Sequence, residues 1–208
     1  MGYYPIFVDM RERPALVVGG GDVAERKVDA LLRVEARVTV VSPTLTARLA
    51  AWVRQGRIRH LGRTYRARDI RGHQFAFVAT DDGAANAAVA RDGRQRGVWV
   101  NAADDPAHCD FILPSVLRRG DLTVAVATGG TSPALARAVR EELEAYLTDD
   151  YATLAEIVGE VRRELRARER SPDAETWNRA LGPDLRALVA AGRPEAAKRR
   201  LLERLGAA

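Results

Sequence analysis

Short apolar runs and amphipathic segments alternate through the first half of the chain. We expect each apolar run to form a strand; the runs cover residues 15–18, 38–41, 58–61, 75–79 and 98–100. The amphipathic segments between them have helical spacing and cover about 22–33, 44–55 and 83–96. Continuous apolar runs are typical of strands that are buried on both faces. Strands that alternate with helices predict an α/β fold with a doubly wound parallel sheet.

The pattern changes after Asp105. Two apolar runs, 111–117 and 122–127, are joined by residues 118–121 without a helix, so they predict an antiparallel hairpin. A helix should follow to about Leu147, because Ser132 is a good N-cap and Pro133 a good first helical residue. Further helical patterns cover residues 151–165, 174–181, 184–191 and 194–205. We therefore expect a sheet domain at 1–110, a hairpin-and-helix region at 111–147 and an all-helical region at 148–208.

A glycine turn follows the first predicted strand. Gly19, Gly21 and Ala24 have the G-x-G-x-x-G/A spacing between a strand and a helix. Gly19 permits a tight turn, Gly21 lets the backbone approach a pyrophosphate, and Ala24 lets the helix pack on the strand. The start of the helix would offer free N–H groups to the phosphates. This context predicts a Rossmann-type dinucleotide site, and the alternative is a glycine-rich turn that binds nothing.

Ligands of parallel sheets bind beyond the carboxyl ends of the strands. We expect the cofactor to contact residues that follow three strands: Gly19, Gly21, Asp22, Val23, Ser42, Pro43, Thr44, Thr80 and Asp81. Ser42 takes the position where NAD enzymes often carry an acidic residue. Arg48 lies one turn further and could meet a 2′-phosphate, so NAD and NADP both stay open. Asp81 either borders the cofactor or caps the next helix.

The composition argues against a membrane-spanning, secreted or disulfide-rich protein. The chain has 208 residues, 47% of them hydrophobic, which is enough for a globular core. No apolar run approaches the roughly 20 residues that cross a bilayer, and the first residues lack the basic start of a signal peptide. The single cysteine, Cys109, excludes an internal disulfide framework and gives no zinc cluster. We therefore expect a cytoplasmic protein without a membrane partner.

The net charge of +5 favours an anionic partner. Basic residues are spread along the chain, and only Lys198, Arg199 and Arg200 form a tight cluster, which we interpret as a solvated helix face. No basic stripe is interleaved with aromatic residues in the manner of single-strand binders. The sequence therefore predicts no nucleic-acid partner.

Four motifs occur together in a characteristic order. They are residues 19–27 (GGGDVAERK), residues 79–82 (ATDD), Val100-Asn101 with Asp104, and residues 128–136 (TGGTSPALA). Together they resemble the precorrin-2 dehydrogenase and sirohydrochlorin ferrochelatase family of siroheme biosynthesis, whose module also forms the N-terminal part of siroheme synthases. The resemblance is close over residues 1–147 and is mainly a helical pattern beyond. Because the methyltransferase module of the long synthases is absent, we expect uroporphyrinogen methylation to belong to another protein.

The resemblance implies an NAD-dependent oxidation of precorrin-2 to sirohydrochlorin by a homodimer, followed in some members by Fe²⁺ insertion at the same site. Asp104 matches the family's catalytic aspartate, a base that can serve both steps. The substrate is a tetrapyrrole rimmed with carboxylates, which fits the basic excess. We expect it to contact Asn101, Thr128, Gly129, Gly130, Thr131 and Ser132, and we expect no resident metal ion.

Several alternatives stay open. Asp104 could be a cap or turn residue, Thr128 could bond its own backbone, and Asp105 is best explained as a turn residue. His108 and Cys109 are candidate functional groups, although the family pattern requires neither. The competing functions are another NAD(P)-dependent oxidoreductase and a nucleotide-sensing redox regulator. The chain lacks a Tyr-x-x-x-Lys pair for the first and a clear DNA-reading helix pair for the second.

Overall fold

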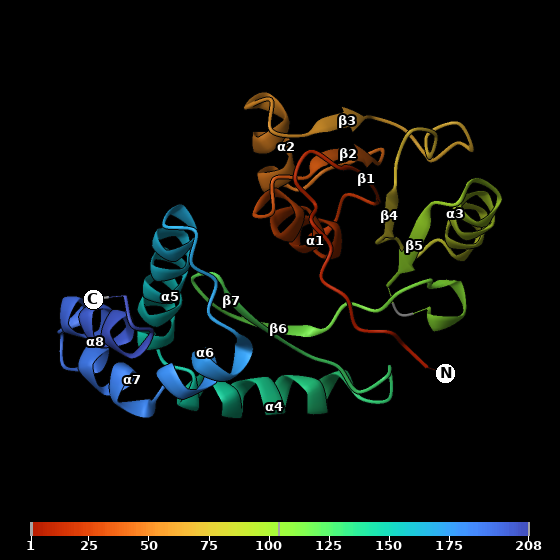
Figure 1. The fold of residues 1–208 in the computed structure, drawn as a ribbon. Helices are drawn as coiled ribbons and strands as arrows, with labels where there is room; N and C mark the ends of the chain where they lie inside the picture. Colours follow the sequence, from red (N-terminus) through yellow and green to blue (C-terminus); the bar gives the residue numbers. More distant parts are fainter. Residues whose placement is uncertain (1, 104, 208) are drawn as a thin grey trace. The chain divides into compact units, whose positions relative to one another are not determined.

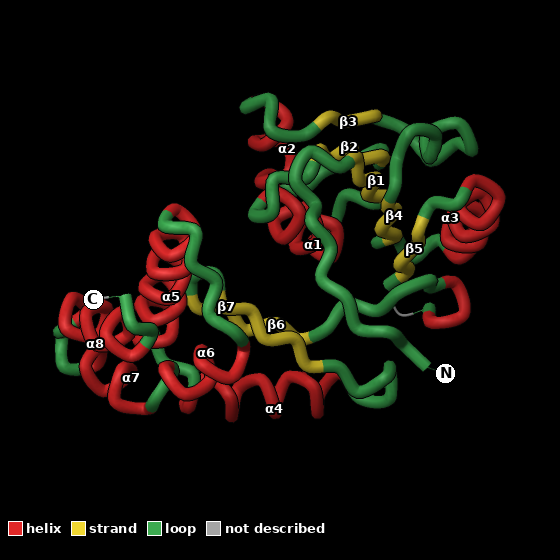
Figure 2. Tube along the Cα trace, viewed as in Figure 1, coloured by secondary structure: helices red, strands yellow, loops and turns green. Residues whose placement is uncertain are grey.

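The computed structural model describes residues 2–103 and 105–207 of the chain (Figures 1 and 2). These residues form two compact units, Met1–Ile112 and Leu113–Ala208. The finer division that we expect at residues 110 and 147 stays a prediction.

A five-stranded parallel sheet forms the centre of the first unit (Figure 1). Its spatial order is β3-β2-β1-β4-β5, and each pair of neighbours runs parallel. The strands are β1 (Pro14–Val18), β2 (Arg37–Val41), β3 (Arg59–Leu61), β4 (Phe75–Val78) and β5 (Trp99–Ala102). The order reverses at β1 and β4, the point at which ligands bind in sheets of this kind. The predicted Rossmann-type doubly wound sheet is confirmed.

Helices cover both faces of this sheet. Because successive side chains of a strand point to opposite faces, β1 contributes to two cores. Ala15 and Val17 pack with α1 (Asp22–Leu32) and α2 (Ala47–Arg54) on one face. Leu16 and Val18 pack on the other face with Val89 of α3 (Gly83–Arg96). A loop at residues 62–74 joins β3 to β4 on this second face, where Ile70 is buried and Tyr65 is half-buried.

The second unit contains a hairpin and helices. Strands β6 (Ser115–Arg119) and β7 (Leu122–Val126) are antiparallel, as predicted, and the turn between them is Gly120-Asp121. Helix α4 (Pro133–Tyr146) packs on this hairpin. A separate core joins α5 (Asp150–Ala167), α6 (Ala174–Ala180), α7 (Pro183–Ala190) and α8 (Pro194–Arg204). No helix of the described part of the chain is long and apolar enough to cross a membrane.

Candidate nucleotide site

The turn after β1 is shaped by two crowded glycines and one open glycine. Gly19 has φ = +124°, and a Cβ at this position would lie 2.0 Å from the Ala79 carbonyl oxygen. A Cβ at Gly20 would lie 1.9 Å from the Thr44 carbonyl oxygen. A Cβ at Gly21, by contrast, would meet no atom within 4 Å. The first two glycines therefore hold the turn against β4 and the loop after β2, while the third leaves open space beside the helix start.

The first turn of α1 is left uncapped. Gly21 is its N-cap residue and supplies no side-chain hydrogen bond. Among the described residues, four other helices, α2, α3, α4 and α6, are closed by a side-chain cap. In α3 the cap is Asp82, whose Oδ1 accepts from the Ala84 and Ala85 N–H groups. Ala24 is fully buried against β1, which brings the α1 axis close to the sheet. Free amides at a helix N-terminus, beside open space, form an anion site suited to a pyrophosphate.

The loop after β2 forms one flank of this site. Ser42 is buried beneath Gly20, and its carbonyl oxygen lies 2.9 Å from His60 Nε2. Pro43 and Thr44 are exposed at the same strand end. This flank therefore presents backbone and a threonine side chain rather than a carboxylate.

Arg48 is held by acidic residues of α1. Its guanidinium lies 2.9 Å from Asp29 and 3.6 Å from Glu25, and it stacks over the Trp52 ring. Glu25 also accepts a 2.5 Å hydrogen bond from Thr46, the N-cap residue of α2. Arg48 thus links α1 to α2 instead of standing free for a 2′-phosphate.

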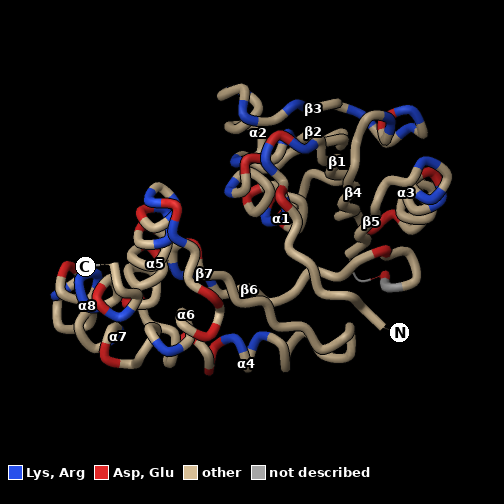
Figure 3. Tube along the Cα trace, in the orientation of Figure 1, with Lys and Arg blue, Asp and Glu red and all other residues tan. Residues whose placement is uncertain are grey.

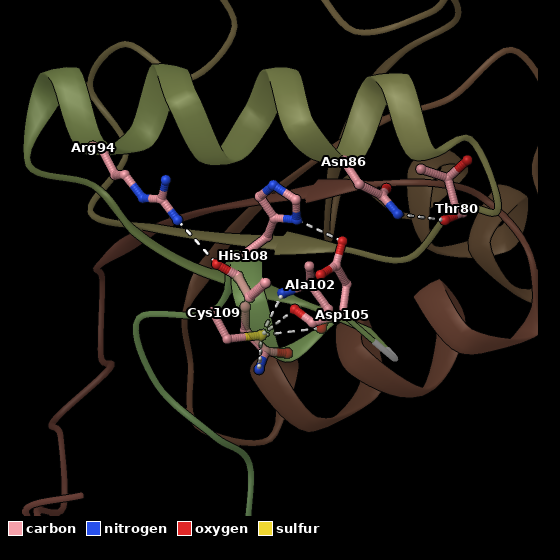
Figure 4. Close-up of polar contacts among 9 residues, drawn as sticks. Thr80, Asn86, Arg94, Ala102, Asp105, His108 and Cys109 are labelled. Atoms are coloured by element: carbon pink, nitrogen blue, oxygen red, sulfur yellow. Dashed lines mark hydrogen bonds and ion pairs between the residues drawn. The ribbon is translucent and has the colours of Figure 1, made fainter. Parts of the chain in front are cut away.

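The loop after β4 forms the other flank. Thr80 Oγ1 accepts a hydrogen bond from the Asp82 N–H, and Asp82 is the residue that caps α3. The alternative role of Asp81 as the cap is therefore wrong, and this aspartate is exposed instead. Buried Asn86 donates to the Thr80 carbonyl oxygen, while its Oδ1 atom has no hydrogen-bond partner among the described residues (Figure 4). Both flanks and the glycine turn meet at the carboxyl edge of the sheet.

Asn101 connects β5 to α1. Its side chain is 7% exposed, its Oδ1 atom accepts from Lys27 Nζ at 2.9 Å, and its Nδ2 atom donates to the Phe111 carbonyl oxygen at 3.0 Å. Lys27 also lies over the Phe77 ring. Through these contacts the Asn101 side chain holds α1 and the Phe111 segment to β5. The role of Asn101 in substrate binding stays a prediction.

The chain beyond β5 turns back through the short 3₁₀ helix Pro106–His108 (Figure 4). Asp105 Oδ2 lies 2.6 Å from His108 Nδ1, which supports the turn role expected for Asp105. Cys109 Sγ lies 3.2 Å from the Ala102 N–H and 3.1 Å from the Ala102 carbonyl oxygen, and burial raises the pKa of its thiol. Cys109 therefore anchors the segment and is poorly suited to nucleophilic chemistry. Asp104, the expected base, lies outside the described residues.

The glycine-rich turn of the second unit precedes α4. Thr128 Oγ1 donates to the Ser132 carbonyl oxygen at 2.9 Å and accepts from the Ser132 N–H at 3.0 Å. Ser132 caps the helix as predicted, by accepting from the Leu135 N–H. Gly129 and Gly130 adopt positive φ and are exposed, as is Thr131. The alternative for Thr128, a hydroxyl bonded to nearby backbone, is the arrangement observed.

Sequence reasoning missed Gly20 and Lys27. The crowding at Gly20 depends on the loop after β2, which no local pattern reveals. Lys27 belongs to the GGGDVAERK motif, so that motif was the available signal for its contact with Asn101. Both residues act by holding the glycine turn and the α1 helix to the rest of the sheet.

Comparisons with known proteins agree with this geometry. A family model described as "Putative NAD(P)-binding" matches residues 6–115, and one described as "Sirohaem biosynthesis protein central" matches residues 119–146. "Siroheme synthase 1" of Pectobacterium atrosepticum is 41% identical over 207 residues, which are 99% of this chain and 43% of that protein. "Siroheme synthase" of Methylococcus capsulatus is 40% identical over 210 residues, covering 100% of this chain and 44% of that protein. The chain thus spans less than half the length of these relatives.

A solved structure of similar fold covers nearly the whole chain. "SirC, precorrin-2 dehydrogenase" superimposes with a TM-score of 0.74 at 25% sequence identity, over 98% of this chain and 99% of that one. This likeness extends through both units, beyond the nucleotide site itself. The chain therefore belongs to the precorrin-2 dehydrogenase and siroheme synthase family of NAD(P)-binding proteins.

Proposed function

We propose that this protein dehydrogenates precorrin-2 to sirohydrochlorin with NAD⁺ as the oxidant. In this reaction the tetrapyrrole loses one hydride and one proton. One observation carries the proposal: an uncapped helix start beside the open Gly21 position, in a chain that matches precorrin-2 dehydrogenase along almost its full length. The names of that structure and of the siroheme synthases supply the substrate class.

The residues around the glycine turn fit a dinucleotide. The free N–H groups of the first α1 turn would hold the pyrophosphate, and the exposed Pro43 and Thr44 would border the adenosine. Thr80 and Asp81, at the neighbouring strand end, would border the nicotinamide half. The nicotinamide supplies the hydride acceptor when it is bound. Arg48, the residue that the sequence offered for a 2′-phosphate, is paired with Asp29 and Glu25, which supports NAD rather than NADP.

We assign the base to Asp104. Its position in the family motif supports this role, because dehydrogenation requires an acceptor for the departing proton. Asp105, the adjacent carboxylate, already bonds His108 within the turn. Asp104 is therefore the carboxylate of this pair proposed to take the proton.

The exposed turn at Gly129–Gly130 is proposed to bind substrate carboxylates. Its positive φ values and exposed backbone N–H groups suit an anion. Since the Thr128 hydroxyl is bonded to Ser132, we expect Thr128 to shape this turn more than to touch the substrate through its side chain.

Iron insertion is proposed as a second step, on the strength of the relatives' name, siroheme synthase. Fe²⁺ is then a substrate: it enters the macrocycle as two pyrrole N–H protons leave. Asp104 is proposed to accept these protons one at a time and to release the first to solvent before it takes the second. No group of three or more metal-ligating residues occurs in the described part of the chain, so a resident ion is not part of the proposal.

A homodimer in the cytoplasm is the proposed working form. Leu135 and Tyr146 of α4 are 54% and 62% exposed, and Val116 of the hairpin is 39% exposed. Apolar side chains gathered on one hairpin-and-helix layer favour burial against a second copy of the chain.

The function is tested by mixing the protein with precorrin-2 and NAD⁺ under anaerobic conditions. We expect sirohydrochlorin and NADH to appear in equal amounts, and NADP⁺ to support a much slower reaction. A tetrapyrrole spectrum that stays unchanged beside the same mixture without protein would overturn the proposal.

A further inference from the structure

The excess of basic over acidic residues in the chain is greatest in one segment. Residues 54–71 contain seven arginines and one acidic residue, Asp69, so their net charge exceeds the +5 of the whole chain. We propose that this segment is an electrostatic capture surface for the polycarboxylate tetrapyrrole; the inference rests on the proposed function. We call it the arginine face and define it by its six exposed arginines: Arg54, Arg57, Arg59, Arg66, Arg68 and Arg71.

The charge of the arginine face is not neutralised within the described structure. None of its six arginines forms an ion pair there, whereas the seventh arginine of the segment, Arg63, is bound to buried Asp69 at 2.6 Å. Arg57 stacks over the Trp52 ring, a contact that leaves its charge in place. Exposed, unpaired guanidinium groups attract anions over about a Debye length, which is roughly 10 Å at 0.1 M salt.

In the basic cluster that the sequence emphasised, by contrast, Lys198 and Arg200 are paired with acidic residues. Lys198 of α8 contacts Glu160 and Glu164, and Arg200 contacts Asp184. Basic and acidic positions occur side by side along α5 and α8 (Figure 3). The interpretation of that cluster as a solvated helix face agrees with these pairs. The arginine face was overlooked because its arginines alternate with other residues from the end of α2 to the loop after β3 and form no run of adjacent basic residues.

The surface beside the arginine face is concave. A hollow of about 590 Å³ lies at the amino ends of β1, β2 and β3, and Arg57 and Arg59 form part of its wall. Glu12 and Glu35 are also part of this wall, and Glu12 is paired with Arg37. The wall of the hollow thus carries both acidic and basic residues. We therefore propose that the tetrapyrrole carboxylates first contact the exposed arginines of the arginine face rather than the interior of the hollow.

The chemistry of this surface favours a tetrapyrrole over a nucleic acid. Single-strand binders stack bases on exposed aromatic rings. Tyr65, the aromatic residue of the segment, is half-buried and donates its hydroxyl to Asp92 at 3.0 Å. A molecule rimmed with carboxylates needs only dispersed positive charge, because guanidinium groups pair well with carboxylates.

The test is the association rate of sirohydrochlorin, the proposed product, measured by stopped flow at several salt concentrations. One variant carries Arg66→Gln, Arg68→Gln and Arg71→Gln, all in the loop after β3. The matched control carries Arg162→Gln, Arg166→Gln and Arg199→Gln, which removes the same charge from exposed positions of α5 and α8. Thermal unfolding of both variants shows whether each has kept its fold.

We expect the loop variant to associate about 3- to 10-fold more slowly than the wild type at low salt, and the difference to vanish at high salt. The control should stay close to the wild type. Equal rates for the wild type and the loop variant would overturn the inference while leaving the proposed function intact. Equal slowing in both variants would also overturn it, because net charge alone would then be responsible.

Two further measurements, of duplex DNA binding and of precorrin-2 conversion, distinguish a nucleic-acid site and a failure of the proposed function from the inference itself. If duplex DNA bound the wild type, and binding fell in the loop variant while sirohydrochlorin association did not, the surface would be a nucleic-acid site and the inference wrong. If the wild type bound NAD⁺ but neither bound sirohydrochlorin nor converted precorrin-2, the proposed function would fail as well.

Discussion

Gly19 and Ala79 are in such close contact that a single added carbon would stand 2.0 Å from the Ala79 carbonyl oxygen. The contact joins the ends of β1 and β4 where the strand order reverses. It places the glycine turn and the Thr80 loop on either side of one site. The nucleotide site is therefore built on a backbone contact rather than on side chains.

Substitution of the turn glycines by alanine should separate folding from binding. Gly19→Ala should lower the free energy of unfolding by about 3 kcal/mol or more, because it adds a clash at a φ of +124°. Gly21→Ala, in open space at negative φ, should cost less than about 1 kcal/mol. Urea titrations of both variants measure these values. Equal losses would show that the turn has a different backbone from the one described.

The half-buried thiol of Cys109 should be slow to react. Burial raises its pKa, so less thiolate is present at mildly alkaline pH than for a free cysteine. We expect an aromatic disulfide reagent to modify the folded protein at least about 10-fold more slowly than the unfolded protein. Cys109→Ser should retain dehydrogenase activity. Rapid labelling of the folded protein, or loss of turnover in the serine variant, would speak for a chemical role.

Assembly is tested through the exposed apolar residues of α4 and the hairpin. Light scattering at micromolar concentration should give the mass of two chains. Leu135→Glu combined with Val116→Glu, at half-exposed positions, should shift the mass toward one chain without unfolding it. A wild-type protein that stays monomeric under these conditions would contradict the proposed dimer.

The two adjacent aspartates offer a matched test of the catalytic carboxylate. Asp104→Asn should lower the dehydrogenation rate by about 10² to 10⁴, since it removes a proton acceptor but keeps size and polarity. Asp105→Asn should cost far less, because an amide oxygen can still accept from His108. NAD⁺ affinity should be similar in both variants.

An inactive Asp105→Asn variant beside an active Asp104→Asn variant would reverse our assignment of the base. If Asp104→Asn lost dehydrogenation but kept iron insertion, the shared base would be excluded.

Much of the fold could be predicted because its signals are local. Ser132 and Pro133 mark the start of α4, and the helix at 83–96 forms with the expected bounds. The cap of α3 was less certain, because Asp81 and Asp82 are equivalent in sequence and only the backbone geometry selects Asp82. The contacts of Gly20 with Thr44 and of Lys27 with Asn101 join segments distant in the chain. The motif that contains Lys27 marks this residue but does not identify its partner, so both pairs are seen only in the folded structure.

The central claim is that a dinucleotide bound at the α1 turn takes the hydride from precorrin-2, and Gly21→Asp tests it most directly. The new carboxylate would cap the free N–H groups of α1 and repel phosphate, so the fold should be kept while the site is closed. The decisive measurement is the initial rate of NADH formation from precorrin-2 across a range of NAD⁺ concentrations, with calorimetric NAD⁺ titration alongside. We predict no measurable rate and no NAD⁺ binding in Gly21→Asp, with sirohydrochlorin binding intact. Wild-type turnover at wild-type NAD⁺ affinity in this variant would contradict the account.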